Sequence, residues 1–261
     1  TGGAVPQVEI TPYLYGKQWA YTVEIDDAPK LTHDVAMPLL ARQQFTDAPP
    51  GVSAGRLMPF VGGAAIIVLR VGGNEHHLSW DDCRALRDAG WGIINHSYFH
   101  RGRLAENGDK LSPEDIRFDL FWSQTLIAHE VGDGRAATHF AYPYGNSVYQ
   151  KYLGEFGMVS GSRTAGKSIR HPYNDGAIHL DYPRNNIDEK AWSGSRGNSE
   201  VLWQFPDGDG PAEGQLVLDF THAIEPPGTQ NNKRWEKRLE FIGRTFGAAG
   251  KDNVWSASNN E

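Results

Sequence analysis

Two adjacent carboxylates, Asp26 and Asp27, follow a strand-like stretch at residues 19–25. A pair of carboxylates can divide two tasks, because one can bind a metal ion while the other takes up a proton as a general base. The run Asp-Asp-Ala-Pro also suits a solvated turn. By itself the pair is therefore compatible with both a site and a turn.

Two histidines four positions apart, His96 and His100, form a second candidate group. Their imidazoles can converge on one side of a helical turn or a tight loop, and imidazole is a common ligand of zinc and similar ions. The chain has ten histidines, so chance pairs are expected, and we interpret His76 and His77 as one of them. Asp27 can supply a third ligand, and two histidines with one carboxylate leave positions open for water and substrate.

Two further segments place polar groups directly after apolar runs. Tyr144, in the run Pro-Tyr-Gly, follows the strand-like residues 138–142, and a backbone N–H near it can support an oxyanion; an aromatic turn is the alternative. His222 follows residues 216–221 and is either a packed, hydrogen-bonded histidine or a general acid.

Alternating strand-like and helix-like segments must position these residues. Periodicity, caps and turn residues predict strands at 19–25, one or both of 57–61 and 64–71, 91–95, 138–142, 158–161, 177–182, 216–221 and 254–257, and helices at 79–90, 112–132, 147–156 and 233–246. Such alternation predicts a parallel sheet, open or closed into a barrel. In both architectures ligands bind at the carboxyl ends of the strands, where the candidate residues lie.

The composition disfavours several classes of protein and excludes cysteine-based sites. The chain of 261 residues has a net charge of −7, which disfavours general nucleic-acid binding, and no apolar run reaches the length of a membrane span. A single cysteine, Cys83, cannot form an internal disulfide or a cysteine-based metal site, so a metal must be held by His, Asp or Glu.

The loop-like stretches 46–55 and 193–214 do not resemble interdomain linkers, and we expect a single domain over residues 1–261.

The order and spacing of these groups resemble the polysaccharide deacetylase family, which is carbohydrate esterase family 4 with the NodB-homology domain. Residues 24–27 (Glu-Ile-Asp-Asp) are similar to its Thr-Phe-Asp-Asp motif, and residues 96–100 match its His-Ser/Thr-x-x-His motif fully. Residues 141–145 (Ala-Tyr-Pro-Tyr-Gly) resemble its Arg-Pro-Pro-Tyr-Gly loop, and residues 218–222 resemble its Leu-x-His element loosely. The resemblance covers about residues 15–258.

The resemblance implies a fold and a set of residue roles. The fold is a distorted (β/α) barrel of about seven strands, with one divalent metal ion that is commonly zinc. The implied roles are metal ligands for Asp27, His96 and His100, general base for Asp26, general acid for His222, and an oxyanion contact from the backbone N–H of Tyr144.

Two positions depart from the family pattern. Ala141 stands where the family has an arginine that orients the base, so Arg184 or Arg163 would have to supply that cation. Arg184 is preferred because it follows a predicted strand. Glu24 replaces the usual threonine and could alter the packing beneath the site.

The implied function is a metal-dependent hydrolase that removes acetyl groups from an N- or O-acetylated carbohydrate polymer or oligomer. One alternative is an amide hydrolase that has the same protein scaffold and acts on a small molecule. Another is a catalytically inactive carbohydrate-binding homologue, although such a module needs none of the five matched acidic and histidine side chains. The family implies a secreted, periplasmic or cell-surface protein, and the chain has no visible signal peptide.

Overall fold

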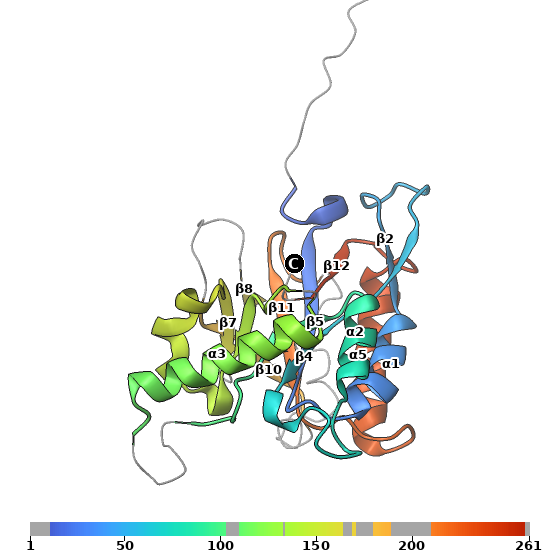
Figure 1. The fold of residues 1–261 in the computed structure, drawn as a ribbon. Helices are drawn as coiled ribbons and strands as arrows, with labels where there is room; N and C mark the ends of the chain where they lie inside the picture. The colour runs from blue at the N-terminus through green and yellow to red at the C-terminus, as the bar shows by residue number, and fades with distance from the viewer. Residues whose placement is uncertain are drawn as a thin grey trace, which may run out of the picture.

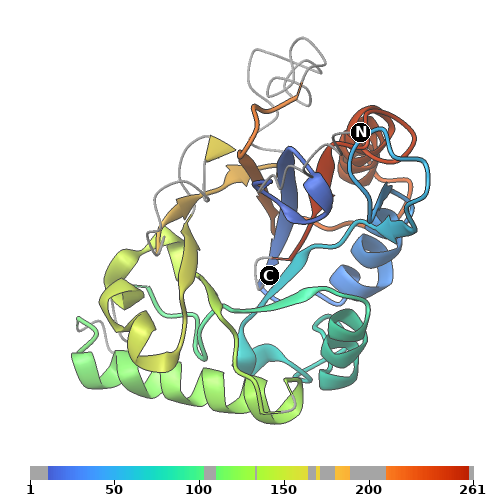
Figure 2. The ribbon, with the colours of Figure 1, turned by 90° about the horizontal axis from the view of Figure 1, so that it is seen from above.

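A barrel wall of parallel strands with helices outside it forms the body of the protein (Figures 1 and 2). The structure, a computed structural model, describes residues 11–102, 110–132, 134–163, 169–170, 180–188 and 210–258. In this part of the chain no helix is long and apolar enough to cross a membrane.

The wall consists of eight strands in one row. Their order is β10 (Asn185–Asn186), β11 (Leu216–Thr221), β1 (Trp19–Asp26), β4 (Gly63–Ile66), β5 (Gly92–Asn95), β6 (His139–Ala141), β7 (Ser160–Arg163) and β9 (Tyr182–Pro183). Each neighbouring pair is parallel. Only Arg184 separates β9 from β10 in the chain, so the two ends of the row meet there and the sheet nearly closes into a barrel. The predicted fold class is therefore confirmed.

Three smaller pairings complete the strands. β12 (Val254–Ser256) pairs with the beginning of β1, and β8 (Ile169–Arg170) pairs antiparallel with β11. β2 (Gln44–Thr46) and β3 (Leu57–Pro59) form a separate antiparallel sheet.

Helices lie outside the ring of strands (Figure 2). They are η2 (Thr32–Ala36), α1 (Met37–Ala41), α2 (Trp80–Asp88), α3 (Pro113–Glu130), η5 (Ser147–Phe156) and α5 (Gln230–Phe246), with short turns η1 (Leu14–Gly16), η3 (Val68–Arg70) and η4 (Pro143–Gly145). Ser79 and Ser112 begin α2 and α3 with capping boxes, and the sequence predicted a helix start at both residues.

Strand β1 separates the core from the functional residues. Tyr21, Val23 and Ile25 belong to the main hydrophobic cluster, which also contains apolar residues of α1, α2 and α5. Because side chains alternate along a strand, Glu24 and Asp26 point the other way, into the barrel. The wall thus buries two carboxylates in its interior.

Several predicted elements differ in detail from the observed ones. The 57–61 segment does not enter the barrel wall, because β3 pairs with β2, and the second half of the predicted 64–71 strand is the turn η3. Residues 147–156 form a 3₁₀ helix, and α5 begins three residues early because the Thr229 side chain caps it. The predictions at 177–179 and 193–209 lie outside the described residues.

Candidate active site

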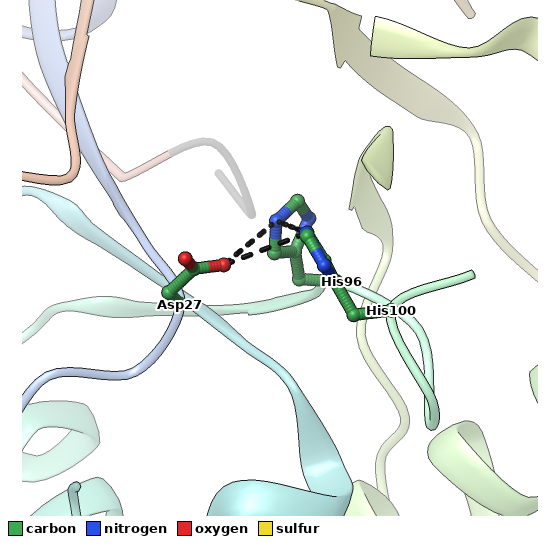
Figure 3. Close-up of side chains that lie close together, drawn as sticks. All are labelled: Asp27, His96 and His100. Atoms are coloured by element: carbon green, nitrogen blue, oxygen red, sulfur yellow. Dashed lines mark hydrogen bonds and ion pairs between the residues drawn. The ribbon is translucent and has the colours of Figure 1, made fainter. Parts of the chain in front are cut away.

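Three predicted metal ligands converge at the carboxyl ends of β1 and β5 (Figure 3). Asp27 Oδ1 lies 3.6 Å from His96 Nε2 and 3.5 Å from His100 Nε2, and the two imidazole nitrogens are 3.1 Å apart. No other group of three His, Cys, Asp or Glu side chains within the described ranges could hold a metal ion. The structure therefore brings together the three residues that the sequence singles out.

The backbone at this rim is unusual. In the described residues, seven non-glycine residues have positive φ, and five of them lie here: Asp27, Ala28, Ser97, His100 and Tyr144. This left-handed region is disfavoured for residues with a side chain and is concentrated at functional sites. The chain thus turns sharply after β1, β5 and β6 and directs these side chains to one place.

The loop after β5 is held by the side chain of Asn95. Its Oδ1 accepts a hydrogen bond of 2.8 Å from the Ser97 backbone N–H, while its Nδ2 donates to Ser123 and Gln124 of α3. The Ser97 hydroxyl then accepts a bond of 2.7 Å from the His100 backbone N–H. The spacing of the two histidines is therefore fixed by a tight loop packed on α3.

Hydrogen bonds, burial and nearby charges act on the three candidate ligands. The Nδ1–H of His96 donates to the Ala141 carbonyl over 2.7 Å, which leaves Nε2 with a free lone pair toward Asp27. Burial, followed by the charge of His96, lowers the pKa of His100 to about 4. Burial raises the pKa of Asp27, but His96, His100 and Arg70 more than offset it and hold that pKa well below its usual range.

These residues fit a divalent cation. At neutral pH the site offers the neutral imidazole of His100 and the ionised carboxylate of Asp27, the states in which they bind metals, and Nε2 of His96 faces the same carboxylate. The buried Oδ1 of Asp27 accepts no hydrogen bond from any described group, although two imidazole nitrogens face it. A cation between the three atoms would satisfy them all.

Metal binding by this trio can be measured directly. Purified His100→Ala should bind a divalent ion at least about 10-fold more weakly, because losing even an outer-shell partner costs about 10- to 100-fold. Binding is measured by titration of the metal-free protein with Zn²⁺. His76→Ala is the matched control, since His76 is 82% exposed and lies outside the trio. Unchanged affinity in His100→Ala would contradict the assignment.

Arg184 lies against Asp26 at the point where the sheet nearly closes. Its Nη1 and Nη2 donate to the two carboxylate oxygens over 2.7 and 2.8 Å, and both side chains are buried. The alternative cation, Arg163, instead pairs with Asp181 at 3.5 Å. Arg184 is thus in contact with Asp26, and its role in orienting a base stays a prediction.

His222 is a second neighbour of Asp26. Its Nε2 is 3.7 Å from Asp26 Oδ2, and its Nδ1–H donates to Asp188 over 3.1 Å. The bond to Asp188 is the main reason that the pKa of His222 is raised, ahead of the opposing effect of burial. The side chain is 45% exposed, so a substrate can reach it. A partly exposed histidine that stays protonated to higher pH has the properties of a general acid.

Tyr144 projects from the rim beside the metal ligands. Its side chain is 75% exposed, and its ring centroid lies 4.6 Å from that of His100. The left-handed backbone at this position breaks the chain direction directly after β6. An oxyanion contact from its N–H stays a prediction.

Sequence reasoning missed three residues that contact the candidates. Asp188 bonds His222, Arg70 lies 3.5 Å from Asp27, and His139 lies beneath the site against Glu24. The only local signal is for Asp188, which ends the mostly polar segment 184–188 after a strand-like segment. The contact of Arg70 with Asp27 depends on the pairing of β4 with β1, and the contact of His139 with Glu24 depends on the curvature of the sheet that brings β6 across from β1.

Comparison with known proteins gives one family match. Residues 60–157 match the family model described as polysaccharide deacetylase, which confirms the resemblance recognised in the sequence. This segment contains His96, His100 and Tyr144, whereas the other candidate residues lie outside it. No curated protein matches the chain.

Solved structures share the fold at low sequence identity. A family 4 carbohydrate esterase from Streptomyces lividans in complex with acetate has a TM-score of 0.53 and 15% identity, over 91% of both chains. A T48 deacetylase with substrate has a TM-score of 0.53 and 13% identity, over 93% of this chain and 88% of the other. A mutant of the CE4 family pseudoenzyme BA3943 with restored activity has a TM-score of 0.51 and 13% identity, over 94% and 67%.

The chain covers less of some other similar structures. It spans 63% of a Streptococcus pyogenes deacetylase, at 14% identity and a TM-score of 0.46. It spans 45% and 46% of two polysaccharide deacetylases from Bacillus species. The three structures with TM-scores above 0.5 show, at 13–15% identity, that the chain shares the barrel fold of the family 4 carbohydrate esterase.

Proposed function

From a polysaccharide deacetylase family match and a barrel of the family 4 carbohydrate esterase type, we propose that this protein is a metal-dependent deacetylase of an acetylated carbohydrate. The observation that carries the proposal is the grouping at one rim of a metal-competent trio, a buried carboxylate–arginine pair and a partly exposed histidine. Together they provide the components that metal-assisted amide or ester hydrolysis requires.

Asp27, His96 and His100 would hold the ion, which we propose is zinc. Such an ion, when bound, would act as a Lewis acid that polarises the acetyl carbonyl and would lower the pKa of the attacking water. Asp26 then takes a proton from the attacking water. Its bidentate pair with Arg184 holds the carboxylate in a fixed orientation for this step.

His222 and Tyr144 would act on the other parts of the substrate. The Nε2–H of His222 donates a proton to the departing amine or alcohol, and Asp188 holds the imidazole by its Nδ1–H. The backbone N–H of Tyr144 supports the negative charge that develops on the acetyl oxygen. The products are acetate and a sugar with a free amino or hydroxyl group.

An aromatic side chain at the rim favours a carbohydrate substrate. The exposed ring of Tyr144 stands beside the candidate ligand His100. Such a ring presents an apolar face suited to the C–H face of a sugar.

Acetate release tests the proposal. Chitin oligomers, peptidoglycan fragments and acetylated xylan fragments are incubated with the protein, with and without a chelator, and acetate is quantified. We expect release from at least one of them, loss of release with the chelator, and recovery with added Zn²⁺. Turnover confined to small amides would favour the small-molecule hydrolase. Sugar binding without turnover in added zinc would favour the inactive binding homologue.

A further inference from the structure

A buried polar cluster lies beneath Asp26, on the inside of the barrel. Glu24, Arg184, His139 and Ser162 are each at most 1% exposed. Nη1 of Arg184 stands between two carboxylates, 2.6 Å from Glu24 Oε2 and 2.7 Å from Asp26 Oδ1. One guanidinium nitrogen is therefore shared by Glu24 and the proposed base.

Glu24 is itself held on both of its oxygens. Ser162 Oγ donates to Oε2 over 2.7 Å, and His139 Nε2 lies 3.0 Å from Oε1. Burial alone would raise the pKa of Glu24, but Arg184 and His139 lower it to about 2. An ionised carboxylate only accepts hydrogen bonds, so Nε2 of His139 must carry a proton. Ser160 Oγ, 2.7 Å from Nδ1, fixes the other side of the ring.

Arg184 needs such anchoring because of where it lies in the chain. It lies between two strands of only two residues each, so little strand pairing holds its backbone, and its long side chain has many rotamers. Glu24 precedes Asp26 by two positions on β1, so both carboxylates share one face of one strand. Contacts to both of them fix the guanidinium relative to the strand that carries the base.

We propose that Glu24 and His139 are positioning residues that hold Arg184 in the bidentate geometry against Asp26. Glu24 acts on the guanidinium directly, and His139 acts by fixing Glu24. This inference rests on the proposed function for its effect on the reaction, because the residue that is oriented is the proposed general base.

The kinetic test uses Glu24→Gln, which keeps the shape of the side chain and removes its charge. We expect kcat for acetate release to fall about 10- to 100-fold, because small misplacements of catalytic groups cost rates of this order. KM should stay within about 2-fold, since neither Glu24 nor His139 is exposed to substrate. Glu24→Asp, which restores the charge, should recover part of kcat. An unchanged kcat in Glu24→Gln would overturn the proposal.

Double variants separate positioning from general damage to the fold. In an Asp26→Asn background, Glu24→Gln should cause no further loss of kcat, because the residue through which it acts is already disabled. An additional loss as large as in the parent would contradict the proposal. His139→Phe should lower kcat less than Glu24→Gln does. The double variant that carries both changes should lose no more kcat than Glu24→Gln alone.

A matched control removes a different paired carboxylate. Asp252 pairs with the fully buried Lys17 at 2.8 Å, near the beginning of β1 and away from its carboxyl end. Asp252→Asn should leave kcat and KM unchanged in the folded protein. A fall in kcat as large as that of Glu24→Gln would show that loss of any such charge is sufficient, and would overturn the proposal.

Crystal structures of parent and Glu24→Gln protein test the positioning without relying on catalysis. We expect the parent to keep both Arg184–Asp26 hydrogen bonds and the variant to lose at least one. An unmoved guanidinium in the variant overturns the inference even if the enzyme is active. Absence of acetate release from the parent would instead refute the proposed function and leave the structural result standing.

Discussion

Asp26→Asn should lower kcat/KM about 10²- to 10⁴-fold on every acetylated substrate, because general-base assistance contributes about that much. The amide of the variant cannot take a proton from water. It also places an NH₂ group or a neutral oxygen against Arg184, which in the parent protein donates to both carboxylate oxygens. The loss should be similar for a natural acetylated sugar and for 4-nitrophenyl acetate, since both require an activated water. Steady-state rates on the two substrates give the measurement.

Metal content must be measured on the same preparation, because Asp26 adjoins the candidate ligand Asp27. We expect Asp26→Asn to retain the ion, and Asp252→Asn to serve again as the control for loss of a paired carboxylate. If Asp26→Asn keeps both the metal and more than about half of the parental kcat/KM, Asp26 is not the base.

His222→Ala should distinguish substrates by their leaving groups. Loss of a general acid should cost about 10²- to 10⁴-fold with an acetylated sugar, because an amine or sugar alkoxide leaves poorly without a proton. With 4-nitrophenyl acetate the loss should be far smaller, since nitrophenolate leaves unaided. Equal losses on the two substrates would reject the acid role and leave His222 as a binding or structural residue.

The pH dependence gives a second measurement of the same residue. His222 must be protonated to act as an acid, so kcat/KM should fall as the pH rises through its pKa. Because Asp188 raises that pKa, this limb should lie above the usual value of about 6.5. Asp188→Asn should move the limb to lower pH. A limb that does not move would show that another group controls it.

Local sequence was enough to predict most of the elements and to single out three candidate metal ligands. Capping boxes at Ser79 and Ser112 and the alternation along β1 are short-range patterns, and the observed elements follow them. His96 and His100 are four residues apart, so one loop brings them together. Parallel strands place their carboxyl ends at one rim, which is why Asp27 could be expected to join them.

The boundaries that were wrong depend on contacts distant in sequence. Residues 57–59 have strand propensity, but they pair with β2 outside the barrel, and the sequence did not predict β2 as a strand. Local propensity predicts that a segment is extended, whereas the neighbour that completes its hydrogen bonds is selected by packing.

The sequence by itself predicted alternating strands and helices with candidate polar residues at the strand ends, and its family resemblance implied the barrel, the three candidate metal ligands and a cation near Asp26. Only the tertiary structure decided that Arg184 rather than Arg163 lies there, because the near closure of the sheet between β9 and β10 turns Arg184 toward β1. It also decided the contacts of Glu24 with His139 and of His222 with Asp188. These partners lie far apart along the chain, and hydrogen bonds in a buried interior follow from which side chains the fold brings within about 3 Å.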